Sequence, residues 1–237
     1  MQIFLYLCSL KRINMTPIAY AHNGFTDKFG IPRQPREDSV IETRIVFEPA
    51  FRIDEALRGI EGFSHLWLLW GFSANKKTDW SPTVRPPRLG GNVRVGVFAT
   101  RSPIRPNPIG LSSVRLKRVE KTSEGLVLVV TGADVLDGTP IYDIKPYIAY
   151  SDSHPNAQNG FTDTTPFPTL QIEGLQEHLK HHKHAVTEAE WREILEPNPR
   201  PAYQDDPDRV YRLDYKGETI SFRIDAQTLF VESITCA

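Results

Sequence analysis

One proline-rich loop carries the most unusual set of polar side chains in the sequence. Residues 99–112 read ATRSPIRPNPIGLS, with three prolines, two arginines, one asparagine and no acid. Proline fixes φ and has no amide hydrogen to donate, so this stretch is neither a helix interior nor a central strand. A stiff loop needs little ordering when it binds, and Arg101, Arg105 and Asn107 offer hydrogen-bond donors. The loop therefore predicts a binding site, although a rigid connection with incidental arginines has the same composition.

The charge distribution around this loop points to an anionic partner. The net charge of the chain is −1, which by itself excludes no partner. No acidic residue lies between Asp79 and Glu120. The basic residues in that span are Arg85, Arg88, Arg94, Arg101, Arg105, Arg115, Lys117 and Arg118. Such a one-sided block is typical of a surface for RNA or a phosphate-bearing ligand, and the alternative is a solvated basic face whose acids lie elsewhere.

A second polar cluster lies in the stretch DVLDGTPIYDIKPY, residues 134–147. Asp143 and Lys145 share one face if residues 141–145 form a strand, because side chains alternate along a strand. The carboxylate could complement a cation, and the lysine could orient or deprotonate a substrate. A turn acid followed by a surface ion pair would have the same sequence.

Two further stretches carry polar residues next to stiff or apolar segments. GIPRQP, residues 30–35, is a proline-bound loop with Arg33 and Gln34. FSHLWLLW, residues 63–70, begins an aromatic strand with Ser64 and His65. A histidine at a strand start is commonly a hydrogen-bonded structural residue, and no nucleophile elbow or Ser-His-Asp order accompanies it. A hydrolase is therefore disfavoured.

Four histidines close together suggest a metal site, namely His178, His181, His182 and His184. His178 and His182 are four residues apart, a spacing that can bind zinc from one helix face. No HExxH glutamate, cysteine or second matching pair accompanies them. We therefore expect a solvated helix face beside lysines, and no metal.

The elements that must position these loops are mainly short strands. The β-like runs, rich in β-branched and aromatic residues and separated by turn signals, are residues 39–47, 65–72, 92–100, 112–120, 125–135 and 140–150. An edge strand and turn are expected from Met15, a hairpin turn at Glu124-Gly125, and one helix within residues 49–63. Many short strands with one helix predict a β-barrel or sandwich for residues 15–154.

The rest of the chain predicts a second, smaller domain. Residues 155–168 are polar and rich in turn residues, and are expected to be a linker. Residues 174–200 are helix-like, residues 209–225 form a hairpin with Lys216-Gly217 at its turn, and residues 228–234 add a strand. The fold is thus predicted to be mainly β, with an N-terminal barrel-like domain and a small α+β domain at residues 169–237.

The ends of the chain bear on its cellular setting. Residues 1–14 begin with an apolar stretch that is too short for a membrane helix and lacks a leading basic region. We expect a dispensable N-terminal extension, the alternative being a short membrane anchor. Cys8 and Cys236 lie near opposite ends and predict no disulfide framework, which favours the reducing cytoplasm.

Several long motifs resemble those of the TsaA-like family, and most closely its bacterial TrmO-type tRNA methyltransferases. The motifs are PRQP (32–35), GFSHLW (62–67), TVRPPRLGGNVRVGVFATRSPIRPNPIGLS (83–112), DVLDGTPIYDIKPY (134–147) and NPRPAY (198–203). The resemblance covers nearly all of the chain beyond residue 14. It implies a homodimer that binds S-adenosylmethionine on a β-barrel and methylates N6 of threonylcarbamoyladenosine at tRNA position 37.

The resemblance also implies which loops bind the cofactor. At matching positions these residues are Pro32, Arg33, Gln34, Ser64, His65, Arg101, Leu111, Asp134, Val135, Leu136, Asp137, Gly138 and Thr139. The Asp/Asn-Pro-Pro-aromatic signature of other adenine-N6 methyltransferases is absent, and RPNP is a different motif. The mechanism by which those enzymes activate the acceptor nitrogen therefore cannot be assumed for this chain.

The candidate residues fit this chemistry. A carbamoylated N6 is a weak nucleophile and a better acid than an amine, so a nearby base would help. Our candidates for that base are Asp143, Lys145 and Tyr147. For the tRNA anticodon stem-loop, the candidates are Arg85, Arg88, Arg105, Asn107 and Tyr142. The alternative is a non-catalytic module that binds S-adenosylmethionine or RNA, and a phosphate-ligand hydrolase is least favoured.

Overall fold

The computed structural model describes residues 15–75, 79–165, 169–180, 185–201 and 204–236. The expected extension, residues 1–14, lies outside the described residues, as do His181, His182 and His184. Among the helices that are described, none is long and apolar enough to cross a membrane.

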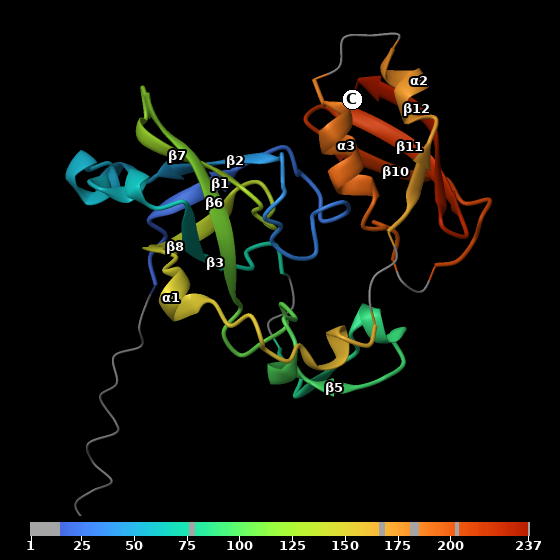
Figure 1. Ribbon diagram of the computed structural model, residues 1–237, viewed down its shortest axis with the longest axis horizontal. Helices are drawn as coiled ribbons and strands as arrows, with labels where there is room; N and C mark the ends of the chain where they lie inside the picture. The colour runs from blue at the N-terminus through green and yellow to red at the C-terminus, as the bar shows by residue number, and fades with distance from the viewer. Residues whose placement is uncertain (1–14, 76–78, 166–168, 181–184, 202–203, 237) are drawn as a thin grey trace, which may run out of the picture.

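Six antiparallel strands form a closed barrel in the order β1-β2-β7-β6-β3-β8 (Figure 1). They are β1 (Ala19–His22), β2 (Glu42–Phe47), β3 (His65–Gly71), β6 (Ile109–Thr122), β7 (Gly125–Thr131) and β8 (Thr139–Pro146). The predicted barrel is confirmed, and so is the β6–β7 hairpin at Glu124-Gly125. The expected edge strand near the N-terminus is wrong, because β1 pairs with β2 on one side and β8 on the other. Closure of the barrel removes its edges.

Alternating side chains fill the interior of the barrel. On β3, Leu66, Leu68 and Trp70 are buried and point inward, whereas His65, Trp67 and Leu69 are half-exposed on the outer face. This period of two is the ordinary geometry of a strand in a small barrel. The outer face of β3 therefore presents polar and aromatic side chains while the inner face stabilises the fold.

The helix expected within residues 49–63 is wrong. Three 3₁₀ turns take its place, η1 (Pro49–Phe51), η2 (Asp54–Leu57) and η3 (Ile60–Gly62). Gly59 has a φ of 88°, which interrupts the right-handed path that a continuous helix needs. Leu57 and Ile60 still pack against the barrel core, whereas Ile53 and Ala56 of the same apolar pattern are exposed.

The strand expected at residues 92–100 is also largely wrong. Only β5 (Val95–Gly96) is extended, and it pairs with β4 (Thr83–Val84). The chain then curls into η5 (Val97–Ala99), because the Val97 side chain is buried and its N–H donates to the Pro82 carbonyl at 2.9 Å. These elements, with η4 (Pro87–Leu89) and the proline-rich loop, form a small subdomain that we call the basic lobe, residues 79–108.

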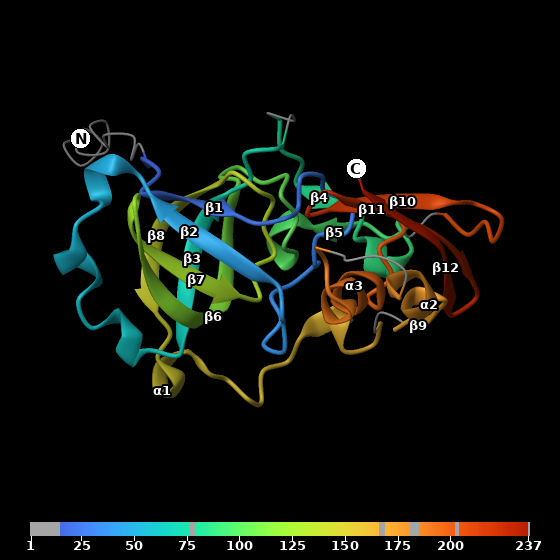
Figure 2. The same ribbon diagram turned by 90° about the horizontal axis from the view of Figure 1, so that it is seen from above.

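The C-terminal part is a four-stranded sheet with two helices on one face (Figure 2). The sheet order is β10-β11-β12-β9, with β10 (Tyr211–Tyr215), β11 (Glu218–Asp225), β12 (Thr228–Cys236) and β9 (Gln171–Glu173). The helices are α2 (Leu175–Leu179) and α3 (Glu188–Leu195), and short turns precede this unit, α1 (Ala149–Asp152) and η6 (Gly160–Thr162). The hairpin at Lys216-Gly217 and the following strand are confirmed, whereas β9 was not predicted.

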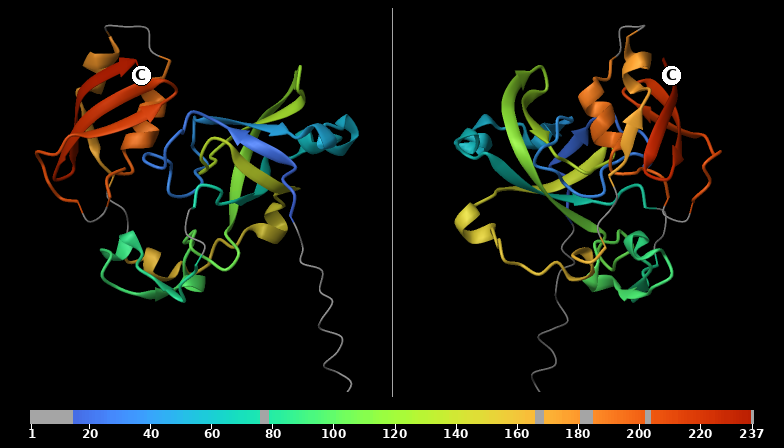
Figure 3. Two further views of the ribbon diagram at one scale, coloured as in Figure 1. Left: turned by 180° about the vertical axis from the view of Figure 1, so that it is seen from behind. Right: turned by 45° about the vertical axis from the view of Figure 1, so that its right-hand side comes forward.

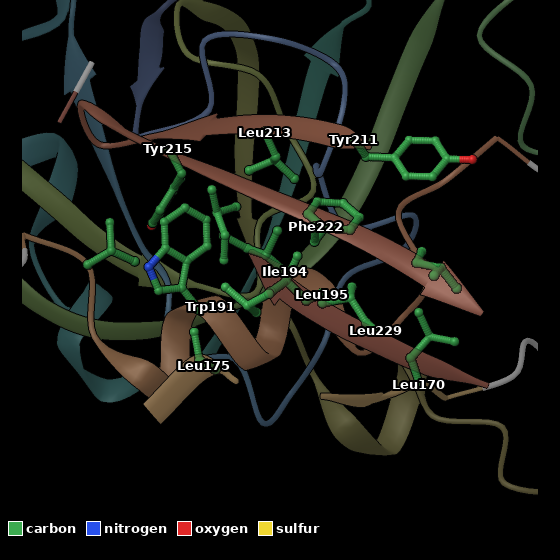
Figure 4. Packing of buried hydrophobic residues seen from close by; sticks show 14 of the residues in the cluster. Leu170, Leu175, Trp191, Ile194, Leu195, Tyr211, Leu213, Tyr215, Phe222 and Leu229 are labelled. Carbon is green, nitrogen blue, oxygen red and sulfur yellow. The ribbon is translucent and has the colours of Figure 1, made fainter. Parts of the chain in front are cut away.

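The core of this unit lies between the sheet and the helices. Figure 4 shows Leu213 and Tyr215 of β10 pointing toward Trp191 and Leu195 of α3, whereas the Tyr211 ring at the end of the strand points away from these two. All five side chains are buried, as the alternation of the predicted hairpin requires for β10. The helix begins with a capping box in which the side chains of its first turn satisfy the free amide groups.

The connection between β1 and β2, residues 23–41, leaves the barrel and joins the second core. Phe25 and Ile41 are buried there, and the Phe25 ring lies 4.8 Å from that of Tyr215. Figure 3 shows this blue connection between the barrel and the C-terminal sheet from two sides. The Val40 N–H donates to Glu193 of α3 at 2.7 Å. The loop that carries Pro32, Arg33 and Gln34 is therefore anchored on the C-terminal unit.

Candidate active site

Asp134 lies in the turn after β7 and is held by side chains from two other strands. Its Oδ1 accepts a hydrogen bond from Ser112 of β6, and the Ser112 Oγ accepts one from Trp70 Nε1 of β3 at 2.8 Å. Gly110 makes room for the indole, because a Cβ at that position would lie 2.2 Å from the Trp70 ring. Ser112 and Trp70 are both buried, so the position of the carboxylate is fixed by the barrel.

The Asp134 carboxyl group is electrostatically unusual. Burial raises its pKa above the ordinary value, and the Ser112 hydrogen bond and the nearby Arg101 act in the opposite direction. A carboxylate that has lost much of its water gains from new donors. It is therefore suited to accept hydrogen bonds from the hydroxyl or amino groups of a ligand.

The PRQP loop meets the proline-rich loop beside this carboxylate. Arg101 donates from Nη1 to the Gln34 side-chain oxygen. Arg33 turns the other way, and its Nη2 donates to the carbonyls of Asn198 at 3.0 Å and Arg200 at 3.2 Å. Gln34, Arg101 and Asp134, three of the candidate cofactor-binding residues, thus lie close together in the structure. Pro32 and Arg33 support it from the side of the C-terminal unit.

The remaining residues of the Asp134–Thr139 loop are bonded to the end of β1. Asn23 donates from its backbone N–H to Asp137 Oδ1 at 2.9 Å and from its side chain to the Val135 carbonyl at 3.0 Å. The Gly138 N–H donates to the Ala21 carbonyl at 2.8 Å. Val135 and Thr139 are buried, Leu136 is half-buried, and Asp137 and Gly138 are exposed. These hydrogen bonds hold the loop against β1, and its exposed residues Asp137 and Gly138 follow Asp134 along the chain.

Ser64 and His65 lie at the opposite end of β3 from this group. The Ser64 hydroxyl is 2.9 Å from His65 Nδ1, and the His65 ring lies 6.1 Å from that of Tyr147. His65 pairs with Arg115 and Leu69 pairs with Leu111, so four residues of strand separate the two levels. That separation is about 13 Å at the usual rise of a strand. Leu111 itself is exposed on the outer face of the barrel.

Asp143 and Lys145 form an ion pair on the outer face of β8. Their Oδ2 and Nζ atoms are 3.0 Å apart, and both side chains are substantially exposed. In the strand register, Asp143 pairs with Leu69 and Lys145 pairs with Trp67. The predicted shared face is confirmed. Asp143 therefore lies at the Leu111 level of this surface, and Lys145 lies midway toward the Ser64-His65 end.

Comparisons with known proteins match this arrangement to one family. The sequence model of the tRNA-methyltransferase O N-terminal domain, TrmO_N, matches residues 20–153. The tRNA (adenine(37)-N6)-methyltransferase of Escherichia coli (strain K12) is 38% identical over 192 residues, which are 79% of this chain and 82% of that protein. The chain belongs to the TrmO family.

Other members of the TrmO family agree in sequence and in structure. A Pseudomonas aeruginosa relative whose name includes the words S-adenosylmethionine-dependent methyltransferase RcsF is 41% identical over 206 residues, 84% of this chain and 87% of that one. A crystal structure of TrmO from Pseudomonas aeruginosa superimposes with a TM-score of 0.73 at 30% identity, and the match covers 94% of this chain and 98% of that chain. The match therefore includes the C-terminal unit as well as the barrel.

The candidate RNA-binding residues of this TrmO-family chain lie on or near the basic lobe. Arg85 and Asn107 are exposed, and Arg88 is half-buried. Arg105 donates from Nη1 to the Thr100 carbonyl at 2.8 Å, so it also braces its own loop. Tyr142 lies against Gly71, where an added Cβ would come within 2.6 Å of its hydroxyl.

One cavity on the described surface lies away from the candidate residues. A cavity of about 310 Å³ lies between residues 54–61 and the side chains of Val119 and Leu126, and its lining includes none of the candidate site residues. Three of its lining residues are acidic, Asp54, Glu55 and Glu61, which makes it unsuited to an anion. Within the described ranges, no group of three potential ligands could hold a metal ion.

Sequence reasoning missed the residues that support the site. Ser112, Trp70 and Asn23 all bond to the Asp134–Thr139 loop or its neighbours. Ser112 is a polar residue on the inward face of a barrel strand, which a known strand register would have revealed. Asn23 precedes Gly24, and this Asn-Gly pair was the available signal for a special turn.

Proposed function

We propose that this chain transfers a methyl group from S-adenosylmethionine to N6 of threonylcarbamoyladenosine at position 37 of tRNA. Membership of the TrmO family supports the reaction class. The single structural observation that supports it is the rigid Asp134 carboxylate beside Arg101 and Gln34. These side chains have the charges and donors that suit a ligand with an amino-acid tail and a ribose.

The protein contributes positioning and proton transfer. S-adenosylmethionine supplies an electrophilic methyl group on a positively charged sulfur. Asp134 and Gln34 would orient the ligand's hydroxyl or amino groups, and Arg101 would hold its carboxylate. Fixing both reactants in line accounts for much of the rate of such a transfer. Rigid anchoring of these side chains by Ser112 and by the C-terminal unit suits that task.

Asp143, Lys145 and Tyr147 are our candidates for the group that takes the N6 proton. Asp143 has the geometry for it, since its exposed carboxylate is held by Lys145 and by the Ile144 N–H at 2.9 Å. Tyr147 packs against the rings of His65 and Trp67, and its hydroxyl could orient the adenine base of the substrate. The amide-like N6 is acidic enough for a carboxylate at close range to assist.

We propose further that the protein acts as a homodimer in the cytoplasm. Ile109 and Leu111 expose apolar side chains on the outer face of β6, beside the half-exposed Leu69 and Trp67. Coverage of this face by a second copy would bury these side chains and bring two sites near the interface. We also propose that residues 15–154 form the barrel domain, residues 155–168 a linker, and residues 169–237 the C-terminal domain.

Methyl transfer is tested with labelled S-adenosylmethionine and tRNA from cells that make threonylcarbamoyladenosine. We expect one labelled methyl group on that nucleoside, detected by mass spectrometry after digestion. The matched control is tRNA that lacks the threonylcarbamoyl group. Cofactor binding without transfer to any RNA would show a non-catalytic binding module instead.

Replacing Arg101 by alanine is expected to weaken S-adenosylmethionine binding about tenfold, because one charge-assisted hydrogen bond is lost. Isothermal calorimetry measures the dissociation constant. Arg94→Ala is the matched control, since Arg94 lies on the basic lobe and donates from Nη1 to the Thr83 hydroxyl of the same lobe at 2.8 Å. Equal affinities of the two variants would remove Arg101 from the cofactor site.

A further inference from the structure

Two aromatic side chains project into solvent from the basic lobe. Phe98 is 73% exposed and Trp80 is 47% exposed, and their ring centroids are 6.3 Å apart at an angle of 32°. Both rank among the most exposed large apolar side chains of the described chain. Exposed pairs of this size are unusual on a protein surface without a partner. Neither residue belongs to the cofactor, base or RNA candidates identified from the sequence.

The backbone holds Phe98 outward. Its neighbour Val97 is buried and its N–H donates to the carbonyl of Pro82, the residue before β4, while the Thr100 N–H donates back to the Val97 carbonyl at 3.1 Å. The turn η5 is thus fixed from both sides, and its central side chain has no inward path. The exposed ring is a built feature of the lobe.

The surroundings of the aromatic pair are cationic. The Arg105 guanidinium lies 5.9 Å from the centre of the Phe98 ring and is fixed by the Thr100 carbonyl. Arg101, three residues from Phe98, reaches Gln34 in the candidate active site. Flat aromatic faces next to guanidinium groups bind unpaired bases, because the bases stack while the cations meet phosphates.

We propose that Trp80 and Phe98 form a stacking platform for an unpaired base of the RNA substrate. This inference rests on the proposed function and adds the residues that receive a base outside the methylation site. A second copy of the chain is the main alternative occupant. Its isologous contact would bring together the arginine-rich surfaces of both copies, in which Asp79 is the one acidic residue of the lobe, and like charges at an interface are costly. Charge complementarity therefore favours RNA.

The test measures binding of an anticodon stem-loop RNA at fixed salt for Trp80→Ala and Phe98→Ala. Each variant is expected to weaken RNA binding about tenfold, as loss of one stacked base does elsewhere. Trp80→Phe and Phe98→Tyr keep a ring and are expected to stay near wild type. Tyr150→Ala is the matched control, because Tyr150 is 93% exposed and lies outside the lobe. S-adenosylmethionine affinity should not change in any of these variants.

Fluorescence provides a second measurement. Trp80 is the most exposed of the four tryptophans, so single-stranded RNA should quench it, and Trp80→Phe should abolish that quenching. Duplex RNA, whose bases are already stacked, should quench far less.

Three results would overturn the platform. The first is wild-type RNA affinity in both alanine variants while the wild-type enzyme methylates tRNA, which would leave the proposed function intact. The second is a shift of these variants from dimer to monomer in light scattering, which would assign the pair to a protein interface. The third is a wild-type protein that neither binds nor methylates tRNA, which would remove the proposed function as well.

Discussion

Replacing Asp134 by alanine is expected to lower the rate of methyl transfer about 100-fold while leaving the barrel folded. The carboxylate accepts a hydrogen bond from Ser112, and its burial strengthens the hydrogen bonds that it accepts from a ligand. Loss of hydrogen bonds to a charged group costs about 1.5–3 kcal/mol each, which corresponds to this change in rate. The check is kcat/KM for transfer to tRNA, with circular dichroism to confirm the fold.

Asp134→Asn removes the negative charge of this side chain but keeps its shape. The amide can still accept from Ser112 but cannot ionise. Burial raises the pKa of the Asp134 carboxyl in the folded state. As the pH rises, this carboxyl therefore ionises at a lower pH in the unfolded chain than in the folded protein. The stability conferred by the protonated carboxyl is present below its unfolded pKa and is lost as the pH rises through the folded pKa.

The Asn variant is therefore expected to melt at a higher temperature than wild type at pH 7, with the difference shrinking toward pH 4, and to transfer methyl groups slowly. A lower melting temperature than wild type at pH 7 would show that the charge is compensated within the protein. Wild-type activity in the Asn variant would show that the site does not use the charge.

Replacing Gly132 by alanine is expected to destabilise the protein by about 3 kcal/mol. Gly132 has a φ of +84°, and a Cβ there would lie 2.3 Å from the carbonyl oxygen of Arg36. The left-handed backbone costs about 1–2 kcal/mol for alanine, and overpacking against a backbone atom adds about 1–3 kcal/mol. For a chain of this size, the melting temperature should fall by about 10 °C.

Gly90→Ala is the matched control for this prediction. Gly90 has a φ of +70°, but nothing lies within 4 Å of an added Cβ. Only the backbone strain remains, so we expect a loss of about 1 kcal/mol. Because Arg36 follows the PRQP loop, Gly132→Ala should also weaken S-adenosylmethionine binding, and Gly90→Ala should not. Equal melting temperatures for the two variants would mean that the contact between Gly132 and Arg36 does not constrain the site.

Short-range patterns predict the parts of this fold that neighbouring residues determine. The alternation of Tyr211, Leu213 and Tyr215 around a Lys-Gly turn predicts β10 and β11 because the period of a strand is local. The same reasoning fails at residues 49–63, where the spacing of apolar residues is helical but Gly59 adopts a left-handed conformation. The spacing predicts the burial of Leu57 and Ile60 but not the exposure of Ile53, because contacts with the barrel decide both.

Long-range contacts account for the rest of what the sequence did not reveal. β9 is three residues long and pairs with a strand more than fifty residues away, so no local pattern marks it. Ser112 becomes a support for Asp134 only after β6, β7 and β3 are in register. The motifs of the candidate site were visible through a family resemblance, whereas their scaffolding needed the three-dimensional structure.

The β1–β2 connection has a consequence for the order of events during synthesis. Phe25 and Ile41 leave the ribosome early, yet they belong to a core cluster that also contains Phe222, Leu229 and Val231. Domains tend to fold as they emerge, beginning at the N-terminus. The barrel strands can pair when residue 146 is out, but the segment bearing Pro32, Arg33 and Gln34 must wait for the last strand of the sheet. A chain interrupted before β12 would thus contain every catalytic candidate and still lack a settled cofactor loop.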